Sequence, residues 1–236
     1  MSLVLNTAIF SFIVQVISGI FLIMAFFYQT NKEDAIIKTI VGLELIVQVL
    51  EGIFYIFIIK MLAKGKIDTS FRYNDWYFST PTMLISTLLF LVYLRTNPFK
   101  NDKQLENLDK TEVNMNVKDI FCENKLLISG IIVFNAAMLI IGYLGEKGIM
   151  GKYPVFWIGS LFLVGSFGCL YQFAKYSQYG KIFLGIMFAI WALYGGAFLL
   201  PVKEKNISYN ILDLFSKNFY GVFLYIVVAL KYGRIL

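Results

Sequence analysis

Histidine is absent from this chain, cysteine occurs only twice, and charged residues make up just 15% of its 236 residues. Without histidine, neither a zinc site of the usual kind nor a histidine-based catalytic triad can form. Cys122 and Cys169 lie far apart in the sequence, without metal-ligand spacing, so we expect both to be inert. The sequence therefore offers neither a candidate metal site nor a histidine-based catalytic site.

Apolar residues are in large excess. They amount to 58% of the chain, whereas an average soluble domain has about 45–50% apolar and about 25% charged residues. Such an excess must face a lipid bilayer, and apolar runs of about 20 residues recur between polar breaks. We predict an all-α, single-domain bundle over residues 1–236. Its seven transmembrane helices would lie at 3–28, 35–61, 70–94, 126–144, 154–176, 181–200 and 206–230.

The connections between these helices predict the orientation of the bundle. The net charge of +6 is better explained by loops that meet anionic lipid than by a nucleic-acid partner. With the N-terminus outside and the C-terminus in the cytoplasm, most lysines and arginines fall on the cytoplasmic side, while Lys147 and Lys205 lie in outer loops. Residues 96–125 mix acids and bases without an apolar face, which predicts a solvated cytoplasmic loop.

Several ionisable side chains remain inside the predicted helices. A charge near the bilayer centre costs roughly 2.5–3.5 kcal/mol, so these side chains must face the bundle interior and be functional or mutually paired. Asp213 and Lys217 are four residues apart and share one helix face, as do Arg72 and Asp75. A simple buried ion pair is the alternative interpretation. The full set is Glu44, Glu51, Arg72, Asp75, Asp213 and Lys217.

Several short motifs along the chain match a known pattern. The run Arg72-Tyr73-Asn74-Asp75-Trp76, followed by Ser79-Thr80-Pro81, resembles the third-helix pattern of the microbial rhodopsin family, with Ser79 replacing a threonine. Further matches are Asp213-x-x-x-Lys217, Trp191-x-x-Tyr194, Phe198 and Trp157, so the resemblance spans essentially the whole chain.

The resemblance implies a cofactor and its site. Lys217 would carry all-trans retinal as a protonated Schiff base, with Asp75 and Asp213 as counterions and Arg72 organising their outer side. Flat aromatic walls suit a conjugated chain, and carboxylates stabilise a cationic imine. Thr80 would form a hydrogen bond with Asn135. The implied retinal pocket comprises Trp76, Thr80, Asn135, Trp157, Trp191, Tyr194 and Phe198.

Polar side chains form stripes on three helices that such a bundle would place side by side. The stripes are Thr7, Ser11, Gln15 and Ser18; Glu44, Gln48, Glu51 and Tyr55; and Asn206, Asn210, Asp213 and Lys217. They could enclose a hydrated, cation-selective route. Hydrogen bonding between helices is the alternative explanation.

A more specific resemblance concerns Ser11, Glu44 and Asn218, which together look like the central gate of channelrhodopsins, with Glu51 as the next pore glutamate. Their placing is also similar to the first group of viral rhodopsins, which are light-gated cation channels. The expected ion pathway comprises Ser11, Glu44, Gln48, Glu51, Asn210 and Asn218. The resemblance implies a multi-pass protein of a host-cell membrane that conducts monovalent cations and protons. Homo-oligomerisation stays open.

Two other functions remain as alternatives. An outward proton pump would use Asp75 as acceptor, but Ser86, at the family's donor position, cannot release a proton at physiological pH. A photosensor is the third interpretation. A light-gated cation channel is the function we expect from the sequence.

Overall fold

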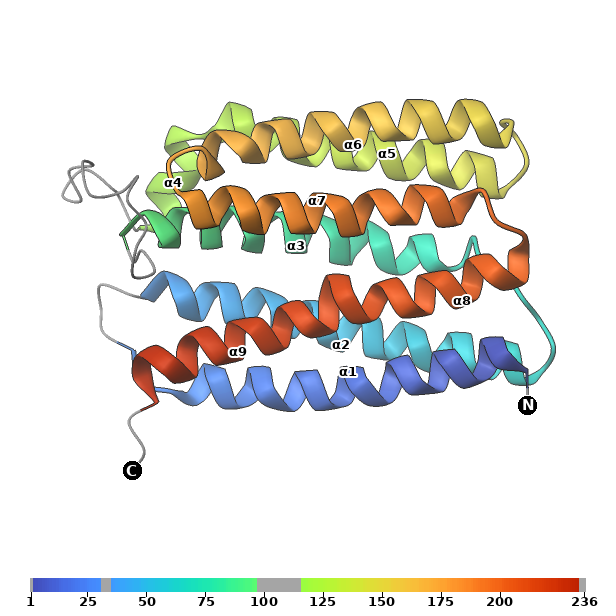
Figure 1. Ribbon diagram of the computed structural model, residues 1–236, viewed down its shortest axis with the longest axis horizontal. Coiled ribbons are helices and arrows are strands. Elements are labelled where there is room, and N and C mark those ends of the chain that lie inside the picture. Colours follow the sequence, from blue (N-terminus) through green and yellow to red (C-terminus); the bar gives the residue numbers. More distant parts are fainter. Residues whose placement is uncertain (1, 31–34, 97–115, 234–236) are drawn as a thin grey trace.

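The computed structural model describes residues 2–30, 35–96 and 116–233. Within these ranges, seven helical spans are long and apolar enough to cross a membrane. They lie side by side as a bundle, with the two chain termini at opposite ends (Figure 1). This arrangement confirms the predicted all-α membrane fold. The expected placing of the N-terminus outside stays a prediction.

The helices agree with their predicted ranges to within a few residues. The first six spans are α1 (Leu3–Phe27), α2 (Ala35–Ala63), α3 (Arg72–Thr96), α5 (Lys125–Glu146), α6 (Lys152–Ala174) and α7 (Gln178–Phe198). The seventh span consists of α8 (Val202–Asp213), the π-helical turn η3 (Leu214–Asn218) and α9 (Phe219–Tyr232).

The connection between α3 and α5 holds a short helix that the sequence did not lead us to expect. It is α4 (Val117–Glu123), whose first turn is capped by Asn116, because the Asn116 side chain accepts a hydrogen bond from the backbone N–H of Lys118 at 3.0 Å. Ile120 of α4 packs into the apolar core. The rest of the predicted solvated loop, residues 97–115, lies outside the described residues.

Two spans run through the centre of the bundle. In the most apolar stretch of each span, 72% of α3 residues and 61% of seventh-span residues are buried, against 22–33% for the other five. Lipid surrounds most of those five helices, which is why their apolar residues are exposed to it. The polar residues of α3 and of the seventh span therefore meet in the interior.

The π-helical turn η3 interrupts the seventh span at its middle (Figure 1). In such a turn the backbone N–H bonds five residues back, and here Phe219 N–H donates to the Leu214 carbonyl. Two carbonyls of η3 also accept side-chain hydrogen bonds. Ser18 Oγ donates to Asn218 O at 2.8 Å, and Gln48 Nε2 donates to Lys217 O at 3.4 Å. The turn is thus tied to α1 and α2.

Close packing of α9 against α1 generates a stability prediction. A Cβ added at Gly221 would lie 2.7 Å from Ser18 Oγ and 2.9 Å from Leu22 Cδ1. Because Ser18 is held by its hydrogen bond to η3, we expect Gly221→Ala to reduce the free energy of unfolding by about 1–3 kcal/mol. Thermal denaturation of the detergent-solubilised protein measures this effect.

Gly168→Ala is the matched control. Gly168 is exposed on α6, and an added Cβ would meet no atom within 4 Å. This variant should be neutral or slightly stabilised, since alanine favours a helix more than glycine does. Equal melting temperatures for the two variants would contradict the close packing.

Candidate functional site

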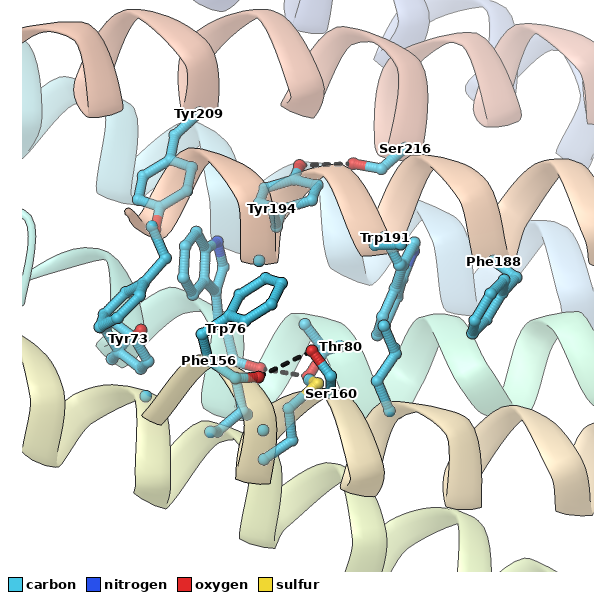
Figure 2. A pocket seen from close by; sticks show the side chains of 18 of the residues that line it. Tyr73, Trp76, Thr80, Phe156, Ser160, Phe188, Trp191, Tyr194, Tyr209 and Ser216 are labelled. Atoms are coloured by element: carbon cyan, nitrogen blue, oxygen red, sulfur yellow. Dashed lines mark hydrogen bonds between the residues drawn. The ribbon is translucent and has the colours of Figure 1, made fainter. Parts of the chain in front are cut away.

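An aromatic cavity of about 220 Å³ lies in the middle of the bundle, between α3, α5, α6, α7 and the seventh span. Trp76 and Trp191 stand at separate places along it, and Tyr194 points in from α7 (Figure 2). Lys217 reaches the same cavity from η3. Of the predicted pocket residues, those that line it are Trp76, Thr80, Trp191, Tyr194 and Phe198. The aromatic residues that we had not predicted are Tyr73, Phe156, Phe188 and Tyr209.

Two predicted pocket residues lie elsewhere. Trp157 is 67% exposed on the outside of α6 and does not line the cavity, whereas its neighbour Phe156 does. Successive residues of a helix point about 100° apart, so only one of the two can face inward. Asn135 stands behind the wall and contacts the cavity through Thr80, because Asn135 Nδ2 donates to Thr80 Oγ1 at 2.9 Å. The expected bond between these two residues is thus present.

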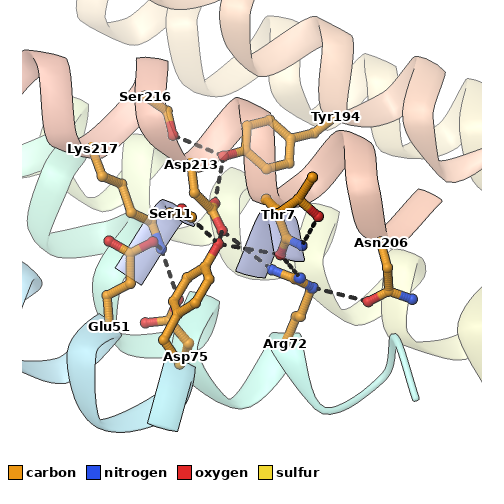
Figure 3. Close-up of polar contacts among 12 residues, drawn as sticks. Thr7, Ser11, Glu51, Arg72, Asp75, Tyr194, Asn206, Asp213, Ser216 and Lys217 are labelled. Carbon is orange, nitrogen blue, oxygen red and sulfur yellow. Dashed lines mark hydrogen bonds and ion pairs between the residues drawn. The ribbon is translucent and has the colours of Figure 1, made fainter. Parts of the chain in front are cut away.

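Lys217 lies between two carboxylates at the polar end of this cavity (Figure 3). Its Nζ donates a hydrogen bond to Asp75 Oδ2 at 2.7 Å and lies 3.2 Å from Glu51 Oε1. All three side chains are buried. Asp75 therefore stands where a counterion is expected. Glu51, which we had placed along the ion pathway, contacts the amine as well.

Asp213 has a different set of partners from the one that its spacing suggested. It accepts hydrogen bonds from Tyr55 Oη at 2.6 Å, from Tyr194 Oη at 2.7 Å and from Arg72 Nη1 at 3.2 Å. Among the described residues, its ion pair is with Arg72 and not with Lys217. Asp213 and Lys217 share one helix face, as predicted. Their side chains nevertheless form ion pairs with different residues.

The Arg72 guanidinium is held on several sides. It donates to Asn210 Oδ1 and, at 3.4 Å, to Asn206 Oδ1. It also lies 5.7 Å from the ring centre of Tyr55 and 5.8 Å from that of Tyr209, within the range of cation–π attraction. Asn210 continues the network by donating to Thr7 Oγ1 at 2.9 Å. These bonds close the half of the bundle that is nearer to the N-terminus.

The charges of this connected group do not balance. Its cations are Arg72 and Lys217, and its carboxyl groups are Glu51, Asp75 and Asp213. A buried net charge is costly, so one proton on a carboxyl group would make the cluster neutral.

The predicted gate of Ser11, Glu44 and Asn218 is divided in the structure. Ser11 Oγ donates to Tyr55 Oη at 3.2 Å, beside Asp213, while Glu44 accepts a hydrogen bond from Ser86 of α3. On α1 it is Ser18, two turns beyond Ser11, that contacts Asn218. A stripe of residues on one helix face does not say which of its turns meets the neighbouring helix, so the sequence could not show that Ser18 and not Ser11 contacts Asn218.

The half of the bundle nearer to the C-terminus holds buried polar atoms without protein partners. They belong to Gln15 of α1, Glu44 and Gln48 of α2, and Asn218 of η3, all at most 4% exposed. Within the described ranges, Gln15 Oε1, Glu44 Oε2, Gln48 Oε1 and both polar side-chain atoms of Asn218 form no hydrogen bond with another residue. Buried polar groups of this kind usually bind water. Unpartnered polar groups thus gather at the α1, α2 and η3 interface.

An ion pair lies beside the aromatic cavity, towards the end of the bundle that holds the N-terminus (Figure 1). Lys205 Nζ lies 2.8 Å from Glu146 Oε1, and both side chains are at most 5% exposed. Thr69 Oγ1 donates to the second oxygen of Glu146, and the Lys205 amine lies 4.8 Å from the ring centre of Phe198. Our placing of Lys205 in a loop was therefore wrong. The α8 helix begins earlier than predicted and carries Lys205 inward.

Comparison with known proteins relates this arrangement to other chains. A family model described as bacteriorhodopsin-like protein matches residues 6–230. The green-light absorbing proteorhodopsin of Gamma-proteobacterium EBAC31A08 is 27% identical over 191 residues, which cover 71% of this chain and 64% of that relative. The crystal structure of viral rhodopsin OLPVRII is 25% identical and has a TM-score of 0.77, covering 98% of this chain and 99% of that one.

A blue light-absorbing proteorhodopsin from Med12 is similar to this chain in fold only. Its structure has a TM-score of 0.72 at 16% sequence identity, with 98% of each chain covered.

Removing one member of the ion pair between Lys205 and Glu146 should be costly. In Lys205→Met the Glu146 carboxylate would stay buried without its cation, so we expect the free energy of unfolding to fall by about 3–5 kcal/mol. The double variant Lys205→Met/Glu146→Gln should recover part of that loss. Lys203→Met, at an exposed site two residues away, is the control. If the change in the free energy of unfolding of the double variant equals the sum of the changes in the two single variants, Lys205 and Glu146 are not coupled.

Proposed function

Because this chain belongs to the bacteriorhodopsin-like family and is a retinal-binding microbial rhodopsin, we propose that Lys217 carries the retinal as a protonated Schiff base. When bound, all-trans retinal supplies light absorption and isomerisation of a double bond. The cavity suits such a group, because its walls are largely aromatic and an amine stands at one end. Trp76 and Trp191 are the flat walls that would hold the conjugated chain.

Asp75 and Glu51 are the proposed counterions, since both contact Lys217 Nζ. Their negative charge holds the proton on this nitrogen. Asp213 acts from further away, through Arg72 and the hydroxyl groups of Tyr55 and Tyr194. Asp75 forms the shorter contact, with a hydrogen bond at 2.7 Å. It is therefore the proposed acceptor when Nζ loses its proton.

The proposed activity is a light-gated cation channel. The observation that carries it is the set of unpartnered polar side chains at the interface of α1, α2 and η3. Each buried polar group without a partner costs about 1–3 kcal/mol unless water is bound to it, so the interface supports a hydrated segment. Glu44 and Glu51 lie along it, and their carboxyl groups, when ionised, favour the passage of cations.

In the dark this route is closed by two groups of bonds. On one side the Arg72 network fills the space between α3 and α8. On the other side Gln15 Nε2 donates to the Gln48 carbonyl at 2.8 Å, and Ser18 donates to the carbonyl of Asn218. Lys217 and Asn218 are adjacent in η3, so a change at Lys217 acts directly on the bonds that hold α1 and α2 to this turn.

A light-driven proton pump is the second candidate. The hydrogen bond from Lys217 Nζ to Asp75 provides an acceptor on one side of the amine, and Glu44 offers a carboxyl group on the other. One-way transfer along these groups would move a proton across the bundle without an open route.

The attachment site is tested by Lys217→Ala. Without this amine no covalent pigment forms, so the purified variant incubated with all-trans retinal should lack the visible absorption band. Lys203→Ala, which removes an exposed lysine, should keep that band. The attachment proposal fails if Lys217→Ala shows the wild-type absorption spectrum.

Whole-cell recording under illumination separates the channel from the pump. For a channel the photocurrent should reverse sign with voltage, and its reversal potential should follow the cation gradient. A current that stays outward at every voltage would identify the pump. No current in cells that contain the coloured protein would reject both.

The location of the route is tested by Asn218→Leu, which keeps the side-chain volume but removes the unpartnered amide. We expect the photocurrent to fall about tenfold while the visible absorption band remains. The reason is that losing one water-binding group raises the barrier to cation passage by about 1–1.5 kcal/mol. Asn74→Leu makes the same change at an exposed position of α3 and should conduct normally. Equal currents in both variants would exclude the proposed route.

A further inference from the structure

Glu44 differs from the other buried carboxyl groups. Glu51, Asp75, Asp213 and Glu146 each lie within ion-pair distance of a lysine or arginine, but Glu44 forms no ion pair with any described residue. Its side chain is 0% exposed. Burying a carboxylate without a cation is far more costly than burying the neutral acid. Its surroundings therefore favour a carboxyl group that holds its proton.

The position of Glu44 is set by Ser86. Ser86 follows Asp75 by eleven residues on α3, about 16 Å along the helix towards the C-terminal end of the bundle. The Ser86 hydroxyl donates to Glu44 Oε1 and also to the carbonyl of Met83, at 3.0 Å. A serine cannot release a proton near neutral pH. The hydrogen bond nevertheless brings a carboxyl group from α2 to this point of α3.

We propose that Glu44 is the internal proton donor for Lys217. After Lys217 Nζ has passed its proton to Asp75, the O–H bond of the Glu44 carboxyl group breaks and an N–H bond forms at Nζ. Glu44 is left as a carboxylate and takes up a proton from the membrane side at which the C-terminus lies. The step rests on retinal being attached to Lys217, and it holds for a channel and for a pump alike.

The proton travels through the polar interface between these two residues. Glu44 and Glu51, which contacts Nζ, are seven residues apart on α2, about 10 Å along its axis, so the transfer is not direct. Gln48 lies between them, and its Oε1 and the Asn218 amide are free to bind water. The ionisable groups that act on Glu44 are Lys217 of η3 and Tyr220 of α9.

Glu44→Gln tests the donor. In flash photolysis the visible absorbance reports when Nζ regains its proton, and this recovery should slow by roughly 100-fold or more, the usual contribution of a positioned acid. Azide, a small weak acid that can enter the protein, should restore the rate. Glu204→Gln makes the same change at an exposed site and should recover like the wild type. Unchanged recovery in Glu44→Gln overturns the proposal.

Infrared spectroscopy provides a second readout that does not depend on rates. Light should remove the C=O stretching band of a protonated carboxyl group in the wild type, and Glu44→Gln should lack that change. Ser86→Ala keeps the acid but loses its hydrogen bond, so the same band should appear at higher frequency. A light-induced carboxyl loss that persists in Glu44→Gln, or a band unmoved in Ser86→Ala, contradicts the assignment.

These outcomes separate the donor from the rest of the proposed function. Absence of colour in Lys217→Ala concerns the attachment site, and absence of current concerns the channel. If absorbance recovery is slow in Glu44→Gln and azide restores its rate, Glu44 is the proton donor, even in a protein that passes no current.

Discussion

The contact of Lys217 with Asp75 and Glu51 is the interaction on which the rest of this structure depends. An amine at the middle of a membrane is tolerated only where carboxylates surround it and lipid does not. This requirement places α3 and the seventh span at the centre of the bundle, because they carry most of the charges. The aromatic cavity begins on one side of Lys217 and the polar interface on the other, so a single side chain joins the two.

The π-helical turn gives that side chain its mechanical connections. In η3 the backbone N–H of Phe219 donates to the Leu214 carbonyl, and the carbonyls of Lys217 and Asn218 accept side-chain hydrogen bonds from Gln48 and Ser18. As a result α1 and α2 are bonded to the backbone of the segment that holds the amine. A displacement of Lys217 would therefore strain the hydrogen bonds that join these two helices to η3. The unpartnered polar atoms lie at the same interface.

The two halves of the bundle differ in how well their polar groups are satisfied. Towards the N-terminal end, Asp213, Arg72 and Asn210 form a dense network with tyrosine hydroxyl groups and Asn206. Such a network holds its members rigidly, because breaking any one bond leaves a buried polar group alone. Towards the C-terminal end, Gln48 and Asn218 retain unused hydrogen-bonding capacity. That half therefore has polar groups available for the proposed hydrated route.

The sequence by itself determined the membrane fold, the seven spans, the buried set of ionisable residues and the likeness to microbial rhodopsins, since all of these follow from composition, from local periodicity and from short motifs. Only the tertiary structure decided that Glu51 and not Asp213 shares Lys217 with Asp75, that Phe156 replaces Trp157 in the cavity wall, and that Ser18 replaces Ser11 beside Asn218. The physical reason is the same in each case. Periodicity identifies the face of a helix that points inward. It does not specify which of two adjacent residues faces the cavity, or how far the helix is shifted along its axis relative to its neighbours. Both depend on packing between residues that are distant in sequence.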